Sequence, residues 1–458
     1  MSTLKAIKGN IVSPNQVCFD HFLLYKDGKV VSIEETVASD IEVFDASGKY
    51  VLPGAVDAHV HCYSALTEGF EAATRSAAGG GVTTIVEMPY DADKLICNEK
   101  VFTDKIQLLE KESVVDVALL ATIAPENGLD QIPILSEAGA CGFKISLFNT
   151  HPVRFPKIEE GVLAEAFQLT KAARRPISVH AETDSIVRKN IEKYKDQGFN
   201  NPIAHCLSRP KLAESTAALT ILEMAFQLDA KAHLHHTTFP HVFELVEHYK
   251  SLGADVTAET CTHYLVFSEE DMDRLGALGK INPPLRSEQD RLGLWELLSE
   301  GEIDIVTSDH APWPIEAKQH ENIFDNSSGA PGVEVLLPIL YSEGVAKGRI
   351  SLNRLVQLVS ENPASRFGLG HRKGKLVPGY DADFVVLDPK EESVVRAENM
   401  HSNAGWSPYE GMKLQGQIQY TFLRGQVIFD GEKVNGKKGY GEYIPAVFGG
   451  ENSNATTM

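Results

Sequence analysis

Histidine side chains stand where a short apolar segment ends, and their spacing suggests metal chemistry. His59 and His61 are separated by one residue at the end of a run that begins at Val51. Side chains of a strand alternate between its two faces, so both imidazoles would point the same way and reach one ion. A lone pair of this type is also typical of solvated surface histidines. Its meaning therefore depends on the residues at other strand ends.

Three further segments end in side chains that bind metals. The first ends near His180, the second carries His233, His235 and His236, and the third contains Asp309. With the first pair, these residues occupy four predicted strand ends in chain order, which indicates a metal site. Imidazole and carboxylate ligands suit zinc and other divalent transition metals. Alternation does not choose within the histidine cluster, because His233 and His235 face opposite to His236.

Lys144 is unusual because it lies in an apolar segment, between Phe143 and Ile145. Burial disfavours an ammonium group and lowers the pKa of the amine. One interpretation is that the amine reaches the rim of the protein or pairs with a carboxylate. The other is that a neutral amine at a site with two metals takes up carbon dioxide as a carbamate, whose two oxygens bridge the ions. Glu182 and Glu259 also lie near strand ends, and we interpret them as groups that support the ligands or lie on the surface.

The elements that must position these side chains alternate along the middle of the chain. Amphipathic segments, among them 159–173, 211–227 and 291–299, separate eight short apolar segments. The predicted strands lie near residues 51–61, 81–89, 115–123, 140–148, 175–182, 231–238, 255–267 and 304–312. Eight such repeats favour an α/β fold of the (β/α)8 TIM-type barrel over a doubly wound sheet. In a barrel, the carboxyl ends of the strands form the catalytic face.

Both ends of the chain are rich in predicted strands. Asp27-Gly28 between two apolar runs predicts a hairpin near the start, and strands are predicted again near the end. We expect residues 1–50 plus 375–445 to form a small β-sandwich domain and residues 51–374 to form the metal-dependent catalytic barrel. Residues 446–458 are predicted to be a flexible tail, because the last ten are small and polar.

Composition excludes several classes of protein. Hydrophobic residues make up 43% and charged residues 23% of the 458 residues, as in an ordinary globular protein. A formal net charge of −20 argues against nucleic-acid or anionic-membrane partners, which need clustered positive charge. No apolar stretch has the length of a transmembrane helix, and the start does not resemble a secretory signal. The six cysteines include no C-x-x-C pair, so we expect a cytoplasmic protein with reduced thiols.

Several segments resemble the amidohydrolase superfamily, specifically its cyclic-amidohydrolase branch of allantoinases, hydantoinases/dihydropyrimidinases and dihydroorotases. These segments are 53–61 with the paired histidines, 142–144 with the lysine, 308–312 with the aspartate, and 374–383 at the return to the β-rich end. Taken together, these segments extend over nearly the whole chain and are highly specific to the superfamily. The resemblance implies a barrel with an added β-sandwich and a hydrolase that acts on cyclic amides.

The resemblance also implies two divalent metal ions, with zinc expected. The implied ligands are His59, His61 and Asp309 for one ion, His180 and His236 for the other, and carboxylated Lys144 as the bridge. The family pattern of a histidine followed by a small polar pair selects His236. Two neighbouring cations lower the pKa of a water molecule, and Asp309 is the implied base that passes its proton to the leaving nitrogen.

The substrate signature of no single subfamily is complete in this chain. Segments 68–89 and 259–264 look most like allantoinases, whereas 280–286 and 329–334 look closer to dihydroorotases. The Glu-Pro-Gly-Arg sequence common in allantoinases is absent from the loop after the paired histidines. We expect substrate contacts from three residues, Tyr63, Asn149 and Asn282.

Dihydroorotases usually carry an arginine after His-x-His and an asparagine after Met-Pro, to hold the substrate carboxylate. Tyr63 and Tyr90 stand near those places here. We therefore expect neutral cyclic ureides to be hydrolysed with higher kcat/KM than dihydroorotate, because an unpaired buried charge is costly. Arg154 or Arg286 are the residues that would supply the missing cation from another loop.

The favoured hypothesis is a binuclear metal hydrolase that opens the C–N bond of a cyclic amide or ureide, as allantoinases and hydantoinases do. A dihydroorotase is the alternative enzyme. A non-catalytic dihydropyrimidinase-like scaffold is the alternative of another class, although all six ligand positions hold competent residue types. The resemblance further implies a homo-oligomer, either a dimer or a tetramer, that acts on a small molecule.

Overall fold

The computed structural model describes residues 3–449 of the chain. Its centre consists of a three-stranded and a five-stranded parallel sheet. In chain order, their strands are β5 (Ala55–Val60), β6 (Val82–Glu87), β7 (Asp116–Leu119), β8 (Phe143–Ser146), β9 (Ile177–His180), β10 (Ala232–Leu234), β11 (Val256–Cys261) and β12 (Ile305–Thr307). Each predicted strand of the middle region coincides with one of these. Almost all of their residues are buried, as expected for parallel strands covered by helices.

Backbone contacts join the two sheets into a closed ring. At one seam, the His61 N–H donates to the His310 carbonyl oxygen at 2.8 Å. At the other seam, the Lys144 N–H donates to the Ala121 carbonyl oxygen, also at 2.8 Å. A parallel bridge accompanies each hydrogen bond. The strands therefore form the predicted (β/α)8 barrel, and the doubly wound alternative is excluded.

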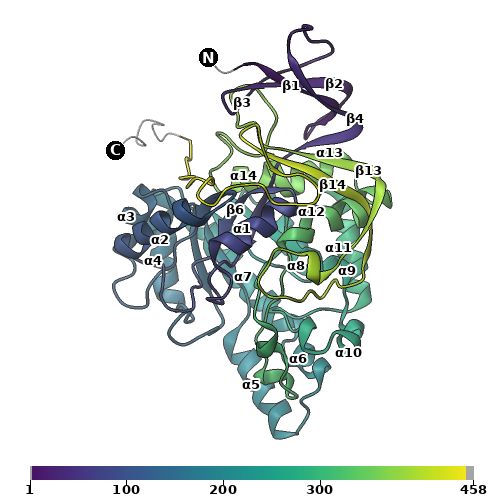
Figure 1. Cartoon of the computed structure of the whole chain (residues 1–458). Coiled ribbons are helices and arrows are strands. Elements are labelled where there is room, and N and C mark those ends of the chain that lie inside the picture. Colours follow the sequence, from purple (N-terminus) through teal and green to yellow (C-terminus); the bar gives the residue numbers. More distant parts are fainter. Residues whose placement is uncertain (1–2, 450–458) are drawn as a thin grey trace.

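Helices connect successive strands and cover the outer side of the barrel. They are α1 (Gly69–Gly79), α2 (Glu99–Glu112), α3 (Gln131–Glu137), α4 (Glu160–Ala172), α5 (Asp184–Asp196), α6 (Pro202–Ser208), α7 (Lys211–Leu228), α8 (Pro240–Ser251), α9 (Thr262–Val266), α10 (Met272–Leu275), α11 (Glu288–Glu300), α12 (Leu336–Ile339), α13 (Leu352–Val356) and α14 (Asn362–Arg366). The three amphipathic segments expected from the sequence correspond to α4, α7 and α11. Figure 1 shows α5 and α6 at the end of the molecule that lies away from the N-terminal strands.

The two ends of the chain meet in one mixed sheet of seven strands, in the order β15-β14-β13-β4-β1-β2-β3. Its strands are β1 (Lys5–Val12), β2 (Val17–Lys26), β3 (Lys29–Glu34), β4 (Glu42–Pro53), β13 (Phe384–Val394), β14 (Lys413–Leu423) and β15 (Gln426–Phe429). β4 runs parallel to β1 and antiparallel to β13, where Val51 faces Val386. The hairpin predicted at Asp27 and Gly28 joins β2 to β3, and both residues have positive φ. Figure 1 shows this sheet beside the barrel, with purple and yellow-green strands together.

A buried ionic cluster joins this sheet to the barrel. Lys373 Nζ lies 2.8 Å from Asp381 Oδ2 and 2.7 Å from Asp383 Oδ2, and it also contacts Asp116 of β7. Arg424 donates to Asp116 Oδ2 at 2.6 Å. Burial alone would raise the pKa of Asp116, but Lys373 and Arg424 hold it below its usual range. The three carboxylates are thus occupied by cationic side chains and form structural ion pairs.

Residues 446–448 of the predicted flexible tail pack against the barrel. The Ala446 N–H donates to the Gly139 carbonyl oxygen at 3.0 Å, and the Val447 N–H donates to the Gly368 carbonyl oxygen at 2.8 Å. Phe448 is 7% exposed. The prediction was wrong here because apolar side chains of this segment find a buried place on the barrel. Residues 450–458 of the predicted tail lie outside the described residues.

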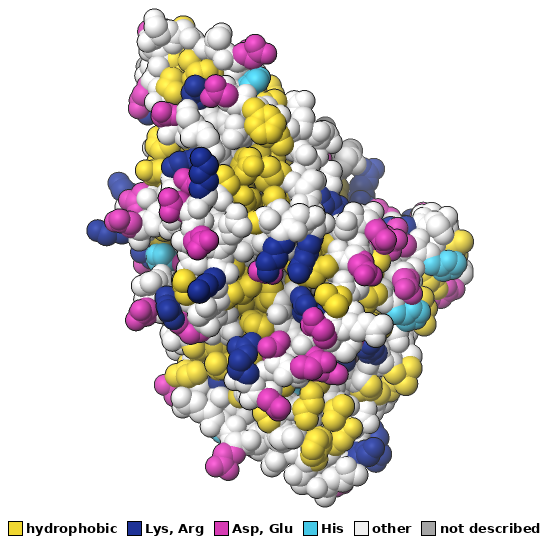
Figure 2. Space-filling model, turned by 90° about the vertical axis from the view of Figure 1, so that its right-hand side faces the viewer, with side chains coloured by type: hydrophobic (Ala, Val, Ile, Leu, Met, Phe, Trp, Pro, Cys, Tyr) yellow, Lys and Arg dark blue, Asp and Glu magenta, His cyan; other side chains and the backbone are white. Residues whose placement is uncertain are grey.

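The surface mixes charges of both signs. Figure 2 shows Lys and Arg side chains interspersed with Asp and Glu side chains on one face, with hydrophobic side chains between them. Within residues 3–449, no helix has the length and apolar character needed to span a bilayer. All six cysteines lie in this range and are free thiols.

Candidate active site

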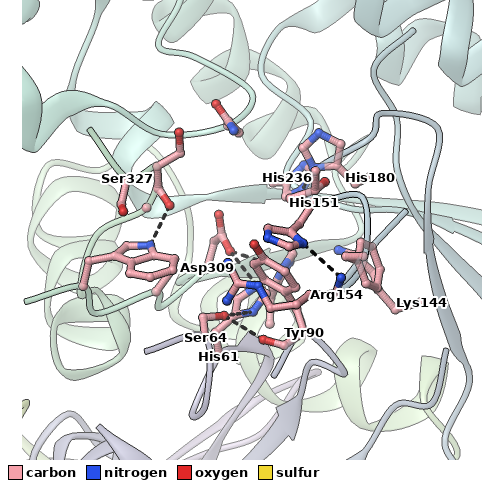
Figure 3. Close-up of a pocket in the computed structure, with 18 residues that line it drawn as sticks. His61, Ser64, Tyr90, Lys144, His151, Arg154, His180, His236, Asp309 and Ser327 are labelled. Carbon is pink, nitrogen blue, oxygen red and sulfur yellow. Dashed lines mark hydrogen bonds and ion pairs between the residues drawn. The ribbon is translucent and has the colours of Figure 1, made fainter. Parts of the chain in front are cut away.

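A cavity of about 250 Å³ opens at the carboxyl ends of the barrel strands. Its lining comes from loops and strand ends that are far apart in the sequence (Figure 3). The lining includes all six predicted metal ligands, which are His59, His61, Lys144, His180, His236 and Asp309. The structure therefore brings the predicted ligand set together in one cavity.

His59, His61 and Asp309 form one group of candidate ligands. His59 Nε2 lies 3.2 Å and His61 Nε2 lies 3.6 Å from Asp309 Oδ1. Burial lowers the pKa of both imidazoles well below the usual value, so they favour the neutral form that binds metals. Burial also raises the pKa of Asp309 to about 7.

His180 and His236 form the second group. His180 Nδ1 lies 2.9 Å from His236 Nε2, so the two ring nitrogens face each other. On its other side, His180 Nε2 lies 2.7 Å from Glu182 Oε2, which also contacts Arg209. Burial alone would raise the pKa of Glu182, but Arg209 and His180 lower it to about 2. Glu182 is therefore an anion that orients the His180 ring.

Lys144, on β8, lines the cavity with a side chain that is almost fully buried. Burial lowers the pKa of its amine to about 8, although Glu259 and Asp309 act in the opposite direction. No carboxylate within residues 3–449 lies at ion-pair distance from this amine. The interpretation as a carboxylate-paired lysine is therefore not supported, and the amine is available for chemistry inside the cavity.

Glu259, on β11, supports three histidines from behind the cavity. Its Oε1 accepts hydrogen bonds from His59 Nδ1 at 2.5 Å and His235 Nδ1 at 2.8 Å. Its Oε2 accepts from His233 Nε2 at 3.0 Å. The carboxyl group is fully buried. Of the two interpretations that the sequence left open for Glu259, the structure favours support of a ligand over a surface position.

Two candidate ligands adopt left-handed backbone conformations. The φ angle is 40° at His236 and 44° at Asp309. Residues other than glycine rarely adopt such angles, and this kind of strain concentrates at functional sites. β10 ends at Leu234, so His236 lies beyond the strand, where alternation of side chains no longer applies. This is why spacing alone does not choose within the histidine cluster.

The atoms without partners at this site fit divalent metal ions. His59 Nε2 is buried and has no hydrogen-bond partner among the described residues, and His180 Nδ1 and His236 Nε2 face each other at 2.9 Å. Leaving such atoms unpaired is costly, so natural structures satisfy them with a partner. Imidazole nitrogens and a carboxylate oxygen are also the donor set that divalent transition metals bind. The residues present therefore suit metal ions in both groups.

Comparison with known proteins identifies the family. Residues 50–428 match the amidohydrolase family. The chain belongs to that family. Its relatives include the L-hydantoinase of Paenarthrobacter aurescens, 35% identical over 92% of this chain and 93% of that protein. The allantoinase of Deinococcus radiodurans is 33% identical over 89% of this chain and 91% of that protein.

Solved structures agree with this placement in the amidohydrolase family. The L-hydantoinase (dihydropyrimidinase) from Arthrobacter aurescens superposes with a TM-score of 0.93 at 33% identity, covering 97% of this chain and 100% of that one. The dihydropyrimidinase from Brevibacillus agri superposes with a TM-score of 0.90 at 27% identity, covering 97% and 99%. Amidohydrolases are metal-dependent hydrolases, which agrees with the candidate ligand groups of the cavity.

Of the three predicted substrate contacts, this amidohydrolase brings one to the cavity. Asn282 lines it, and the Asn282 Oδ1 atom is buried without a hydrogen-bond partner among residues 3–449. Tyr63 is not a lining residue, because its hydroxyl donates to Glu112 Oε2 at 2.9 Å on the outer side. Asn149 is exposed and is also not a lining residue.

One wall of the amidohydrolase cavity was not predicted as part of the site. Trp313 and the segment 327–329 lie on the loop after β12 and line the cavity. The Trp313 Nε1–H donates to the Ser328 carbonyl oxygen at 2.8 Å, a contact drawn in Figure 3. The glycine-containing segment 329–334 resembles dihydroorotases, but nothing in its residue types indicates a cavity wall.

Two buried lysines tie this wall to the segment that carries Asn282. Lys318 Nζ donates to the Ala277 carbonyl oxygen at 3.1 Å and to the Lys280 carbonyl oxygen at 3.0 Å. Lys280 Nζ donates in turn to the Phe324 carbonyl oxygen at 3.1 Å. These hydrogen bonds join the loop after β12 to the segment that carries Asn282, and so they fix the relative position of these two parts of the cavity wall.

Proposed function

We propose that this amidohydrolase uses two divalent metal ions, most simply zinc, to open the C–N bond of a cyclic ureide or amide. Allantoinase and hydantoinase/dihydropyrimidinase activities are the first candidates, because relatives with these names align over most of the chain. The observation that carries the proposal is the buried Lys144 amine in one cavity with both ligand groups.

The residues present would divide the metal ions between them. His59, His61 and Asp309 would hold one ion, His180 and His236 the other, and a Lys144 carbamate both. The carbamate forms when the neutral amine bonds to the carbon of carbon dioxide and releases a proton. Bound cations supply Lewis acidity toward the scissile carbonyl and toward a water molecule.

The remaining steps belong to the side chains themselves. Asp309 Oδ accepts the proton of the attacking water and returns it to the leaving nitrogen. The unpaired Asn282 Oδ1 is placed to accept an N–H of the ring. Tyr90, Phe155 and Trp313 provide apolar walls that exclude bulk water from the reaction.

A turnover screen with the metal-loaded protein tests this function. Allantoin, hydantoins, dihydrouracil and dihydroorotate are offered at equal concentration, with metal content measured on the same sample. Ring opening by protein that carries two ions supports the proposal. Protein that carries two ions and opens none of these rings contradicts it, and protein without metal affinity would favour the scaffold alternative.

Lys144→Ala examines the carbamate separately. The variant is expected to lose metal and activity, and short-chain carboxylic acids are expected to restore part of the turnover by supplying oxygens. Lys144→Arg is the matched control, because it keeps a cation that cannot form the carbamate at neutral pH. Intact mass analysis of wild type should show one added carbon dioxide. Two bound metals and near-normal rates in Lys144→Ala would mean that the carbamate is not formed.

Dihydroorotase remains the second candidate, because Asn282 and Gly329, from the two segments that resemble dihydroorotases, line the cavity. We also propose a homodimer or homotetramer on the basis of the family resemblance. Light scattering on the purified protein would give the mass of the assembly, and a monomer at all concentrations would contradict this expectation.

A further inference from the structure

Arg154 is a cation of the cavity wall without a carboxylate partner. It lines the cavity with the candidate metal ligands, on the side of Tyr90 and His151 (Figure 3). Its guanidinium carbon lies 5.1 Å from the centre of the Tyr90 ring. Within residues 3–449, no ion pair joins Arg154 to Asp or Glu. Partly buried guanidinium groups usually pair with anions, so this one is available to a ligand.

A tight backbone hairpin fixes the position of Arg154. His151 and Phe155 exchange two backbone hydrogen bonds, at 3.2 and 3.0 Å. Within the loop, His151 Nδ1 accepts the backbone N–H groups of Val153 at 3.2 Å and Arg154 at 3.1 Å. Phe155 packs edge-on against Tyr90, with ring centres 5.7 Å apart. The guanidinium is thus presented by a pre-formed loop, which lowers the entropy cost of binding.

The other arginines close to the site are already engaged. Arg286, the second residue that the sequence offered as a source of positive charge, lies 2.9 Å from Glu214 Oε2 and donates to Thr238 Oγ1 at 2.9 Å. Arg209 is buried in the protein interior and forms an ion pair with Glu182. Neither of the two lines the cavity.

The position of Arg154 beside Tyr90 limits which anion it can bind. Tyr90 contacts both the ligand side and Arg154: its ring centre is 6.0 Å from that of His61 and 5.1 Å from the guanidinium carbon of Arg154. A carboxylate on the reacting ring itself would lie beside the metal ligands. A carboxylate at the end of a short side chain extends along the cavity wall beside Tyr90 toward the guanidinium.

We propose that Arg154 determines specificity by binding a carboxylate carried on a side chain of the cyclic substrate. This inference rests on the proposed function and narrows it to acidic side-chain derivatives of cyclic ureides. A guanidinium holds a carboxylate through two parallel hydrogen bonds, which combine charge with fixed geometry. Neutral derivatives of the same shape leave this cation unpaired and are poorer substrates.

A pair of matched substrates tests this assignment. The carboxylate 5-(2-carboxyethyl)hydantoin and its amide, 5-(2-carbamoylethyl)hydantoin, differ in charge but hardly in shape. Wild type is expected to hydrolyse the acid with at least tenfold higher kcat/KM. Arg154→Gln should abolish this ratio by lowering kcat/KM on the acid. Arg274→Gln removes an exposed charge elsewhere, where the side chain is 59% exposed, and should keep the ratio.

Salt dependence and a third substrate provide two further tests of the role of Arg154. The wild-type ratio should fall as ionic strength rises, and Arg154→Gln should show no such dependence. Equal rates on acid and amide in wild type, or an unchanged ratio in Arg154→Gln, would overturn the inference and leave the proposed function standing. A preference for dihydroorotate over its carboxamide, without one for the carboxyethyl compound, would overturn the placement of the carboxylate on a side chain.

A binding measurement keeps the inference testable if no ring is opened, the outcome that contradicts the proposed function. Calorimetry with 5-(2-carboxyethyl)hydantoin and its amide reports affinity without turnover. The acid should bind wild type at least tenfold more tightly than the amide, and the two should bind Arg154→Gln equally. Equal affinities in wild type would reject the role of Arg154.

Discussion

His59 Nδ1 donates to Glu259 Oε1 at 2.5 Å, and the opposite ring nitrogen, His59 Nε2, faces Asp309 Oδ1 at 3.2 Å. The carboxyl group of Glu259 therefore decides which nitrogen of His59 keeps its proton. The nitrogen turned toward the cavity is left with a free lone pair. A residue on β11 thus orients a candidate metal ligand on β5.

Glu259→Gln is expected to weaken metal binding about 10- to 100-fold, because an amide cannot accept hydrogen bonds with both of its terminal atoms. Dialysis against graded chelator, followed by metal analysis, measures this loss, and circular dichroism checks the fold. Glu223→Gln on the exposed side of α7 is the control and should retain metal as wild type does. Wild-type retention by a folded Glu259→Gln would mean that the other contacts suffice to orient the histidines.

Asp309→Asn is expected to lower kcat about 10²- to 10⁴-fold, because the amide keeps an oxygen but cannot accept the proton of the attacking water. Metal content should fall far less than turnover. Steady-state kinetics and metal analysis on one preparation separate the two effects. Activity within a few-fold of wild type would mean that another group transfers the proton. His310 is a poor candidate for that role. Its Nδ1 accepts the Gly332 N–H at 3.1 Å, and it does not line the cavity.

The buried side chain of Lys280 should make the stability of the protein depend on pH between neutral and alkaline values. Burial and the nearby Arg209 lower its pKa to about 7, whereas an unfolded chain has a lysine pKa of about 10.4. Between these values the unfolded chain binds more protons, so the folded state gains stability as pH rises. The unfolding free energy of wild type relative to Lys280→Met should therefore increase from about pH 7 to pH 10. Denaturant titrations at several pH values measure this, and parallel curves for the two proteins would contradict it.

Lys373→Met is expected to destabilise the protein by about 3–5 kcal/mol at neutral pH, because it leaves buried carboxylates short of a cation. Burial would raise the pKa of Asp381, but Lys373 and its neighbours hold it well below its usual range. This contribution is present above an unfolded-state pKa of about 3.9 and is lost as pH falls through the folded-state value. The difference in Tm should therefore shrink below about pH 4.

The control for this measurement is Lys189→Met on α5, whose side chain is 82% exposed. It should change Tm little at any pH. A Lys373→Met protein as stable as wild type at neutral pH would mean that Arg424 alone satisfies Asp116 and that the cluster tolerates the loss of one cation.

The barrel and the meeting of the candidate ligand residues in one cavity were predictable because they depend on local pattern. His59 and His61 share a face of one strand, and Lys144 stands in an apolar run, so each signal lies within a few residues. The choice of His236 needed the family resemblance. The structure gives the physical reason, since the chain turns to a positive φ after β10 and breaks the alternation that spacing arguments assume.

The substrate side of the cavity was less predictable because it depends on partners distant in sequence. Tyr63 follows the paired histidines closely, but Glu112 captures its hydroxyl. Trp313 lines the cavity on a loop that is held in place by two hydrogen bonds. Lys318 of this loop donates to the Lys280 carbonyl oxygen, and Lys280 donates to the Phe324 carbonyl oxygen of the loop. Neither contact produces a periodic pattern in the sequence. Residue type and position alone therefore could not show that Trp313 lines the cavity and Tyr63 does not.

The seven-stranded sheet imposes an order on how the molecule can be completed during synthesis. β4 pairs with β1 on one edge, but the partner of its other edge is β13, which leaves the ribosome after every barrel strand. Until then, β4 carries an open row of backbone groups, the feature through which nascent chains associate with each other. Slow translation near the end of the message would prolong that exposure. We therefore expect the yield of native protein in a cell to depend on prompt synthesis of its last strands, a constraint that a barrel followed by an independent domain does not face.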